Sequence, residues 1–301
     1  MNLKIVADSA SNVYEMNTVD YASVPLKIIA QKEYVDDKNL DVYNMAQEIK
    51  AYKGKSGTSC PNAAEWEEAF CDAEGVFCVT ITSKLSGSYN SAIMAGNQYM
   101  EDHPGRKVHV VDSLSTGPHM KMIIDKLAEL INAGLSFEEV KEQITEYYSH
   151  THLLFSLESV TNLARNGRVS PAIAMAVNAL GIRIVGEAVE GQLEQRNKCR
   201  GEKRAIPLLL NNMKELGFKG AKVMIGHCYN EKGAESLKNA ILAEFPECQI
   251  EIHLNHALNC FYAELGGILV AFEDFYNDKD VQSNVFFFYF NSGSLSSNRS
   301  S

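Results

Sequence analysis

The 301-residue sequence contains no long apolar run. The apolar stretch near the amino terminus, LKIVA, ends at Asp8 and is too short for the core of a secretory signal peptide. No segment reaches the ~20 consecutive apolar residues of a membrane-spanning helix, and VFFFYF (285–290) has only the length of a strand. We therefore expect a protein without a membrane span, located in the cytoplasm.

Metal-binding and disulfide patterns are also missing. The seven cysteines are odd in number and include no CxxC pair, which disfavours a zinc site or a disulfide framework and fits reduced thiols in the cytosol. The eight histidines show no HExxH or other ligand spacing. We expect no metal ion and no cofactor.

Nucleotide and hydrolase signatures are absent as well. The sequence has no GxxxxGK[ST], no GxGxxG and no GxSxG. Its net charge of −10 disfavours non-specific binding to nucleic acid or to an anionic membrane, because both are polyanions. No nucleic-acid-binding motif is recognisable, so regulation through nucleic acid is disfavoured.

Strand-like and helix-like segments alternate in the first half of the chain. Apolar runs typical of buried strands cover 3–8, 75–82 and 107–113, and helical patterns cover 41–51, 61–70, 88–100 and 120–134. This alternation predicts a parallel sheet covered by helices on both faces.

The second half combines a hairpin with further crossover units. Two strand-like runs meet at Glu190-Gly191, a hairpin signal, and strands alternate with helices again from residue 202. We therefore predict an α/β fold of two domains, a parallel-sheet domain over 1–150 and a mixed-sheet domain over 151–278. The Ser/Asn-rich segment 279–301 is predicted to be a flexible tail.

Three polar loops of the first half, 7–11, 56–62 and 83–90, follow strands or precede helices. Loops at the carboxyl ends of parallel strands meet at one edge of the sheet, where ligands bind, and helix amino termini favour anions. Neutral donors in these loops are the hydroxyls of Thr58, Ser59, Ser86 and Ser88. These features predict a site for a small carboxylate or phosphate, although helix capping alone explains the same residues.

Carboxylates stand at the ends of two predicted strands. Asp8 and Asp112 each precede a serine at such an end. Each side chain can accept hydrogen bonds from loop N–H groups or act as a base, and we favour the first role.

Five motifs occur in the order and spacing of the DegV family. They read IVADSAS, GTSCPN, LSGSYNSA, VVDSLSTG and LESVTNLARNGRVS. The chain resembles this family from about residue 3 to residue 275. The family includes the fatty-acid-binding subunits of the bacterial fatty acid kinase. The resemblance implies two α/β domains with a buried fatty acid between them.

The resemblance also implies a set of ligand residues. Carried over by motif, the carboxylate ligands are Thr58 and Ser86, with the N–H groups of Gly87 and Ser88 beside them. Further contacts, either with the ligand or at the mouth of the site, are expected from Ser59, Arg168 and Tyr262. For Arg168 a structural ion pair is an equally good explanation. Tyr262 stands where many members carry a histidine, and tyrosine can donate a hydrogen bond but cannot supply an imidazolium.

In the family the acyl chain runs into the second domain, which makes the helix over 171–181 the expected wall. This segment is apolar nearly all round, a pattern that predicts burial on every side. The residues assigned to the wall are Ile173, Met175, Ala176 and Val177. Each of them can equally be an ordinary core residue.

Members of the family present the bound fatty acid to a separate kinase, which converts its carboxylate to an acyl phosphate for phospholipid synthesis. The resemblance thus predicts a non-catalytic carrier whose partners are a long-chain fatty acid and the kinase catalytic subunit. The segment 195–205 resembles the family's basic stretch near that subunit and contains Arg196, Lys198, Arg200, Lys203 and Arg204. A solvated surface explains these charges equally well.

A second hypothesis is a serine-dependent esterase or acyl-phosphate hydrolase that acts alone. Ser86 would be its nucleophile. The sequence offers no convincing His–Asp pair beside that serine, which argues against this function.

Overall fold

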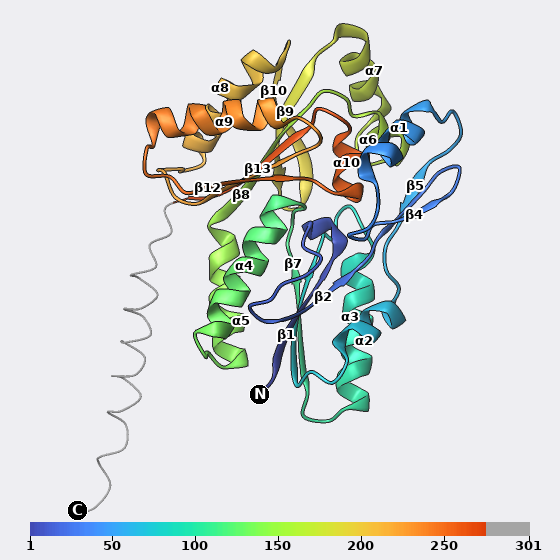
Figure 1. Cartoon of the computed structure of the whole chain (residues 1–301), viewed down its shortest axis with the longest axis vertical. Coiled ribbons are helices and arrows are strands. Elements are labelled where there is room, and N and C mark those ends of the chain that lie inside the picture. The colour runs from blue at the N-terminus through green and yellow to red at the C-terminus, as the bar shows by residue number, and fades with distance from the viewer. Residues whose placement is uncertain (275–301) are drawn as a thin grey trace, which may run out of the picture.

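The computed structural model of the chain describes residues 1–274, apart from the side chains of residues 176, 178 and 179 (Figure 1). The predicted tail, 279–301, lies outside the described residues. Within the described range, no helix has the length and apolarity needed to cross a membrane.

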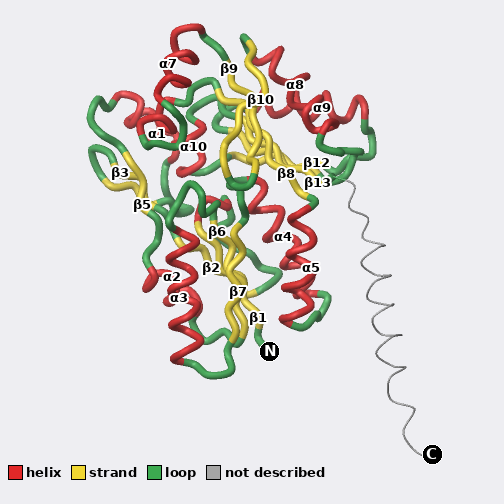
Figure 2. The backbone as a smooth tube through the Cα atoms, turned by 180° about the vertical axis from the view of Figure 1, so that it is seen from behind, coloured by secondary structure: helices red, strands yellow, loops and turns green. Residues whose placement is uncertain are grey.

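A parallel four-stranded sheet, ordered β2-β1-β6-β7, forms the centre of the first half. Its strands are β1 (Leu3–Asp8), β2 (Asp20–Val24), β6 (Gly75–Thr80) and β7 (Lys107–Asp112). Helices α2 (Ala63–Phe70) and α3 (Ser88–Asp102) cover one face, and α4 (Pro118–Asn132) and α5 (Phe137–Ser149) cover the other (Figure 2). The predicted parallel sheet with two covered faces is confirmed.

The side chains of β1 explain why both faces need a cover. Val6 points into the cluster that contains Trp66 and Phe70, whereas Ile5 and Ala7 point into a different cluster. Successive residues of a strand face opposite sides of the sheet. A strand that is apolar at consecutive positions therefore requires helices on both sides.

A small antiparallel sheet precedes α2, and the sequence did not reveal it. Its strands are ordered β4-β3-β5 and comprise β3 (Lys27–Ile29), β4 (Glu33–Val35) and β5 (Gly57–Ser59). Two helices of the first half lie outside the sheets, the short η1 (Ser9–Ser11) and α1 (Val42–Ala51). The segment 56–62, expected to be a loop, is therefore partly a strand in which Thr58 lies opposite Ile28. Three-residue strands are too short to show a periodic pattern.

The second half forms a mixed six-stranded sheet, as predicted, ordered β10-β9-β8-β13-β11-β12. Its strands are β8 (Thr151–Leu157), β9 (Arg183–Val189), β10 (Gln192–Cys199), β11 (Val223–His227), β12 (Ile250–Leu254) and β13 (Ile268–Glu273). Only β11 and β12 pair in parallel. Helices α8 (Glu202–Glu215) and α9 (Glu231–Glu244) pack on one face.

The predicted hairpin between β9 and β10 is present. Its two central residues, Glu190 (φ 47°) and Gly191 (φ 81°), both have positive φ. Two such residues are characteristic of the tight turn whose twist matches that of antiparallel strands.

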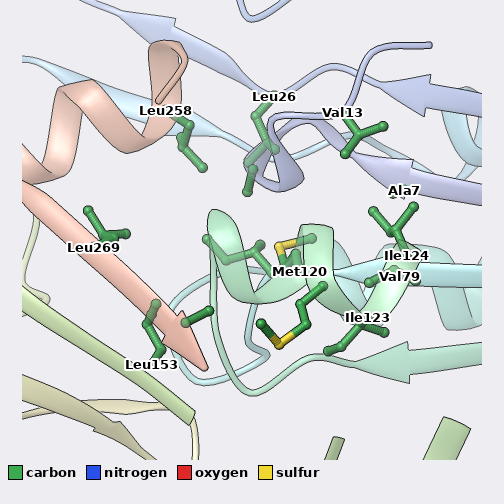
Figure 3. Close-up of a cluster of buried hydrophobic side chains, with 14 of the residues drawn as sticks. Ala7, Val13, Leu26, Val79, Met120, Ile123, Ile124, Leu153, Leu258 and Leu269 are labelled. Atoms are coloured by element: carbon green, nitrogen blue, oxygen red, sulfur yellow. The ribbon is translucent and has the colours of Figure 1, made fainter. Parts of the chain in front are cut away.

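The other face of the mixed sheet shares a core with the first half. Helix α4 packs against strands of both sheets. Figure 3 shows the meeting of these elements through Ala7, Val79, Met120, Ile123, Leu153, Leu258 and Leu269. The change of sheet occurs between α5 and β8. The division into two domains near residue 150 remains a proposal.

Helix α10 (Ala257–Ala263) lies where the halves meet, because it contacts α1, β3 and η1. Helix α6 (Thr161–Arg165) packs against α10, and α7 (Pro171–Leu180) packs against α6. The prediction that α7 is buried on every side is wrong, because Met175 is 71% exposed and Leu180 is 51% exposed. Helix α7 lies at the periphery of the molecule (Figure 1). Only one of its faces packs against the shared core.

Candidate ligand site

The carboxylate of Asp8 fixes the loops that follow β1 and β6. Its Oδ2 accepts hydrogen bonds from the N–H of Ile81 (2.9 Å) and the hydroxyl of Ser88 (2.6 Å), and its Oδ1 accepts one from the N–H of Ala10 (3.2 Å). Complete burial outweighs these three donors and raises the pKa of Asp8 to about 7.

Asp112 plays the same part at the end of β7. Its Oδ1 accepts from the N–H groups of Ser83 (3.0 Å) and Leu114 (3.1 Å). Both aspartates therefore bind loop backbone, as predicted. Neither needs to act as a base to explain its place at a strand end.

The loop before α3 presents one hydroxyl and one N–H group. Ser86 Oγ accepts a hydrogen bond from the N–H of Ser88 at 3.3 Å, so the Ser86 hydroxyl can still donate its own proton to a ligand. Gly87 is the N-cap residue of α3, no side chain caps the helix there, and its N–H has no hydrogen-bond partner within residues 1–274. The hydroxyl of Ser88, in contrast, donates to Asp8 and is fully buried.

A hydrogen bond joins the two halves of the molecule at Thr58. Its Oγ1 lies 2.7 Å from the phenol oxygen of Tyr262 on α10. Burial raises the pKa of Tyr262, and the hydrogen bond from Thr58 and the charge of Arg168 oppose this only in part. The phenol therefore stays neutral at ordinary pH and retains a proton to donate.

The guanidinium of Arg168 links Tyr262 to the loop before α3. Its Nε and Nη2 donate to the carbonyl of Leu85 (3.2 and 3.0 Å), and its Nη1 donates to the carbonyl of Asn166 (2.5 Å). It also lies 5.6 Å from the centre of the Tyr262 ring. Within the described part of the chain no carboxylate pairs with Arg168. Its charge is therefore available beside the loop.

Two glycines allow these segments to approach one another closely. A Cβ added at Gly87 would lie 3.2 Å from Cys60 Sγ, and one added at Gly57 would lie 3.4 Å from the side-chain oxygen of Asn166. Strand β5 is therefore adjacent to both the Ser86–Gly87 loop and the segment that leads to Arg168. These contacts bring Thr58, Ser86, Gly87, Arg168 and Tyr262 together at one place. Neither Cys60 nor Asn166 was expected there, because backbone approach leaves no mark in the sequence beyond the two glycines.

Ser59 and the basic segment lie apart from this constellation. Ser59 is exposed on the opposite face of β5, where its hydroxyl donates to the carbonyl of Cys60 (3.3 Å). Arg196 forms ion pairs with Glu187 and with Glu215 (2.9 Å). The remaining cations of the segment are exposed on β10 and around the start of α8: Lys198, Arg200, Lys203 and Arg204.

Two of the four residues expected to form the acyl wall, Ile173 and Val177, contact the shared core. Val177 is buried there and Ile173 packs against it, together with Ala174, which the sequence did not single out. Met175 faces solvent, so its assignment to the wall is wrong. Ala176 lies outside the residues whose side chains are described. The shared core also reaches the polar site, because Cys60 and Tyr262 pack against it.

No metal centre is built into the described residues. Within residues 1–274, no three His, Cys, Asp or Glu side chains are grouped so that they could hold an ion. The polar donors of the site are hydroxyls, an N–H group and a guanidinium, which suit an anion.

The sequence matches a family model described as "Uncharacterised protein, DegV family" over residues 2–273. A DegV domain-containing protein of Streptococcus pneumoniae is 42% identical over 279 residues, which cover 91% of this chain and 99% of that protein.

Solved structures show the same similarity. The Fatty Acid Kinase (Fak) B3 protein of S. pneumoniae, loaded with linoleic acid, is 41% identical with a TM-score of 0.88, covering 91% of this chain and 99% of that one. A DegV family protein of Eubacterium eligens, loaded with heptadecanoic acid, is 39% identical with a TM-score of 0.88, covering 90% and 99%.

Proposed function

The chain belongs to the DegV family, and from this premise we propose that it binds one long-chain fatty acid and presents the carboxylate to a separate kinase. Solved relatives carry fatty acids, and one of them is named as a protein of fatty acid kinase. In this proposal the chain is a non-catalytic carrier.

The observation that carries the proposal is the group of neutral donors beside an apolar core. Thr58 and Tyr262 share a hydrogen bond of 2.7 Å, and Gly87, next to Ser86, lies close to Cys60, which is two residues after Thr58. Two hydroxyls that share one proton still have a second proton to give to a carboxylate oxygen. Arg168 adds a positive charge at the same place, and hydrogen bonds to an ionised group are the strong ones.

The apolar side of the site supplies most of the affinity in this proposal. Transfer of about fourteen methylene groups from water, at ~0.8 kcal/mol each, contributes roughly 11 kcal/mol. Lost motional freedom and desolvation of the carboxylate each oppose binding by several kcal/mol. The polar donors offset much of the second cost, so tight binding results. Ile173, Ala174 and Val177 of α7 are suitably placed to contact the acyl chain.

A carrier role accounts for Ser86 better than a nucleophilic role. A serine nucleophile requires a base within hydrogen-bond reach. Among the described residues, no histidine and no carboxylate forms a hydrogen bond with Ser86. The esterase hypothesis therefore has no structural support, and we retain the carrier.

The exposed cations of the basic segment suit the docking of an acidic kinase surface. Lys198, Arg200, Lys203 and Arg204 have no ion-pair partner within residues 1–274, whereas Arg196 is already paired. On a chain with a net charge of −10 such a group accelerates the encounter with a negatively charged partner.

Fatty acid binding can be tested by organic extraction of the purified protein. We expect about one fatty acid per chain from the wild type and little from Thr58→Ala/Ser86→Ala. A matched control is Ser59→Ala, because this neighbouring hydroxyl faces away from the site. Equal retention by the double variant would show that these hydroxyls do not bind the ligand.

Presentation is tested by reconstitution with a fatty acid kinase catalytic subunit and ATP. Acyl phosphate can be trapped with hydroxylamine as the hydroxamate. Both proteins together should give product, and this chain alone should give none. Turnover of an activated ester by the chain alone would favour the esterase instead.

A further inference from the structure

The tip of the β9–β10 hairpin rests on the loop that carries Ser86. Thr82, the second residue after β6, is only 2% exposed, and its hydroxyl donates to the carbonyl of Gly191 at the tip (3.0 Å). These residues come from the two halves of the chain. The contact therefore joins the second half to the start of the loop that carries Ser86.

Thr82 also organises the turn that follows it. Its carbonyl accepts from the N–H groups of Leu85 (3.2 Å) and Ser86 (3.3 Å), and its Oγ1 accepts from the N–H of Lys84 (3.2 Å). Its own N–H donates to the carbonyl of Ser115 (2.9 Å). The hydroxyl of Thr82 is thus the link between the shape of this turn and the hairpin.

The contact at Gly191 leaves no space for a side chain. A Cβ added there would lie 2.3 Å from Thr82 Oγ1 and 3.0 Å from Cγ of Lys84. The residue also has φ +81°, a conformation that side chains disfavour. Glycine at position 191 is therefore required both by the hairpin turn and by the close approach of its backbone to Thr82.

The same loop is held from a second direction. Leu85 lies between Thr82 and Ser86, and its carbonyl accepts two hydrogen bonds from the Arg168 guanidinium. The second half thus contacts the loop at two positions, at Leu85 through Arg168 and at Thr82 through the hairpin tip.

We propose that Thr82 and the hairpin tip are positioning elements that orient Ser86 and Gly87 toward the ligand carboxylate. This inference rests on the proposed function and deepens it. Neither residue touches the ligand. Loss of their hydrogen bond lets the turn relax, so that the donors for the carboxylate are no longer aligned, while the apolar side of the site is unchanged.

The test compares two ligands of equal chain length, a fatty acid and the corresponding primary alcohol. Thr82→Val keeps the branched shape of the side chain but removes the hydroxyl. It leaves one donor and one acceptor unpaired, so we expect roughly tenfold weaker binding of the acid and little change for the alcohol. Thr82→Ser should restore binding of the acid. Equal loss for both ligands, or no loss for either, would overturn the inference.

Thr80→Val is the matched control. Thr80 is the fully buried last residue of β6, two positions before Thr82, and its hydroxyl donates to the carbonyl of Val111 (3.4 Å) rather than to the loop that carries Ser86. It should bind both ligands as the wild type does.

Gly191→Ala provides a second variant that acts from the other side of the contact. It should weaken binding of the acid as Thr82→Val does, and unchanged binding would count against the positioning role. A wild type that binds neither ligand would refute the proposed function itself, an outcome distinct from equal binding by wild type and Thr82→Val.

Discussion

Removal of the Tyr262 hydroxyl, a change of a single heavy atom, tests the polar end of the site. In Tyr262→Phe the ring remains packed against the shared core, and the hydrogen bond of 2.7 Å to Thr58 disappears. The fold itself should lose only about 1 kcal/mol, the usual net value of one hydrogen bond.

The effect on ligand binding should be larger. A hydrogen bond to an ionised group contributes about 1.5 to 3 kcal/mol, and each 1.4 kcal/mol corresponds to about tenfold in affinity. We therefore expect binding of a fatty acid to weaken by about ten- to a hundredfold in Tyr262→Phe. Titration of delipidated protein with a fluorescent fatty acid measures this change.

Tyr99→Phe is the matched control, because its buried phenol donates to the carbonyl of Ala73 (2.8 Å) within the other core of the first half. It should lose stability but no affinity. If Tyr262→Phe bound the fatty acid as tightly as Tyr99→Phe, the phenol would not be a ligand donor, and our reading of the site would be wrong.

Three further perturbations follow from the described contacts. Arg168→Lys removes the fork that holds the carbonyl of Leu85, since a lysine cannot donate in that geometry; we expect about tenfold weaker fatty acid binding by the same titration, and an unchanged affinity would argue against this link. Ser88→Ala leaves buried Asp8 without its shortest hydrogen bond, so chemical denaturation should reveal a loss of about 1 to 3 kcal/mol; a smaller loss would mean that Asp8 finds another donor. Burial lowers the pKa of His119 to about 3, so between pH 6.5 and 3 the unfolded chain binds a proton at this residue and the folded chain does not. Lowering the pH from 7 to 5 should therefore reduce the free energy of unfolding by about 2 kcal/mol through this group. His119→Gln should lack this part of the pH dependence, measured by chemical denaturation at both pH values.

Local features of the fold could be predicted because their causes are local. The capping box of Ser136 and Glu139 at the start of α5 depends on residues only three apart, a Ser-x-x-Glu pattern that the sequence displays directly. The hairpin at Glu190-Gly191 depends on two adjacent residues that accept positive φ. The strand β5 was missed because its pairing with β3 is long-range and only three residues long.

The candidate site was predicted less completely than the fold. Family motifs suggested Thr58, Ser86 and Arg168, and Tyr262 was expected only as a substitute for a histidine. Nothing in the sequence indicated that Tyr262 would share a hydrogen bond with Thr58, because the two are brought together by tertiary packing of α10 against β3. The exposure of Met175 was likewise hidden, since apolar composition does not say which face of a helix has a neighbour.

Native mass spectrometry of the purified protein, before and after incubation with a long-chain fatty acid, tests the central claim most directly. We predict a single species whose mass exceeds that of the chain by one fatty acid, and we predict that Thr58→Ala/Ser86→Ala gains no such mass under the same conditions. A wild-type chain that stays at its bare mass after the incubation would contradict the account.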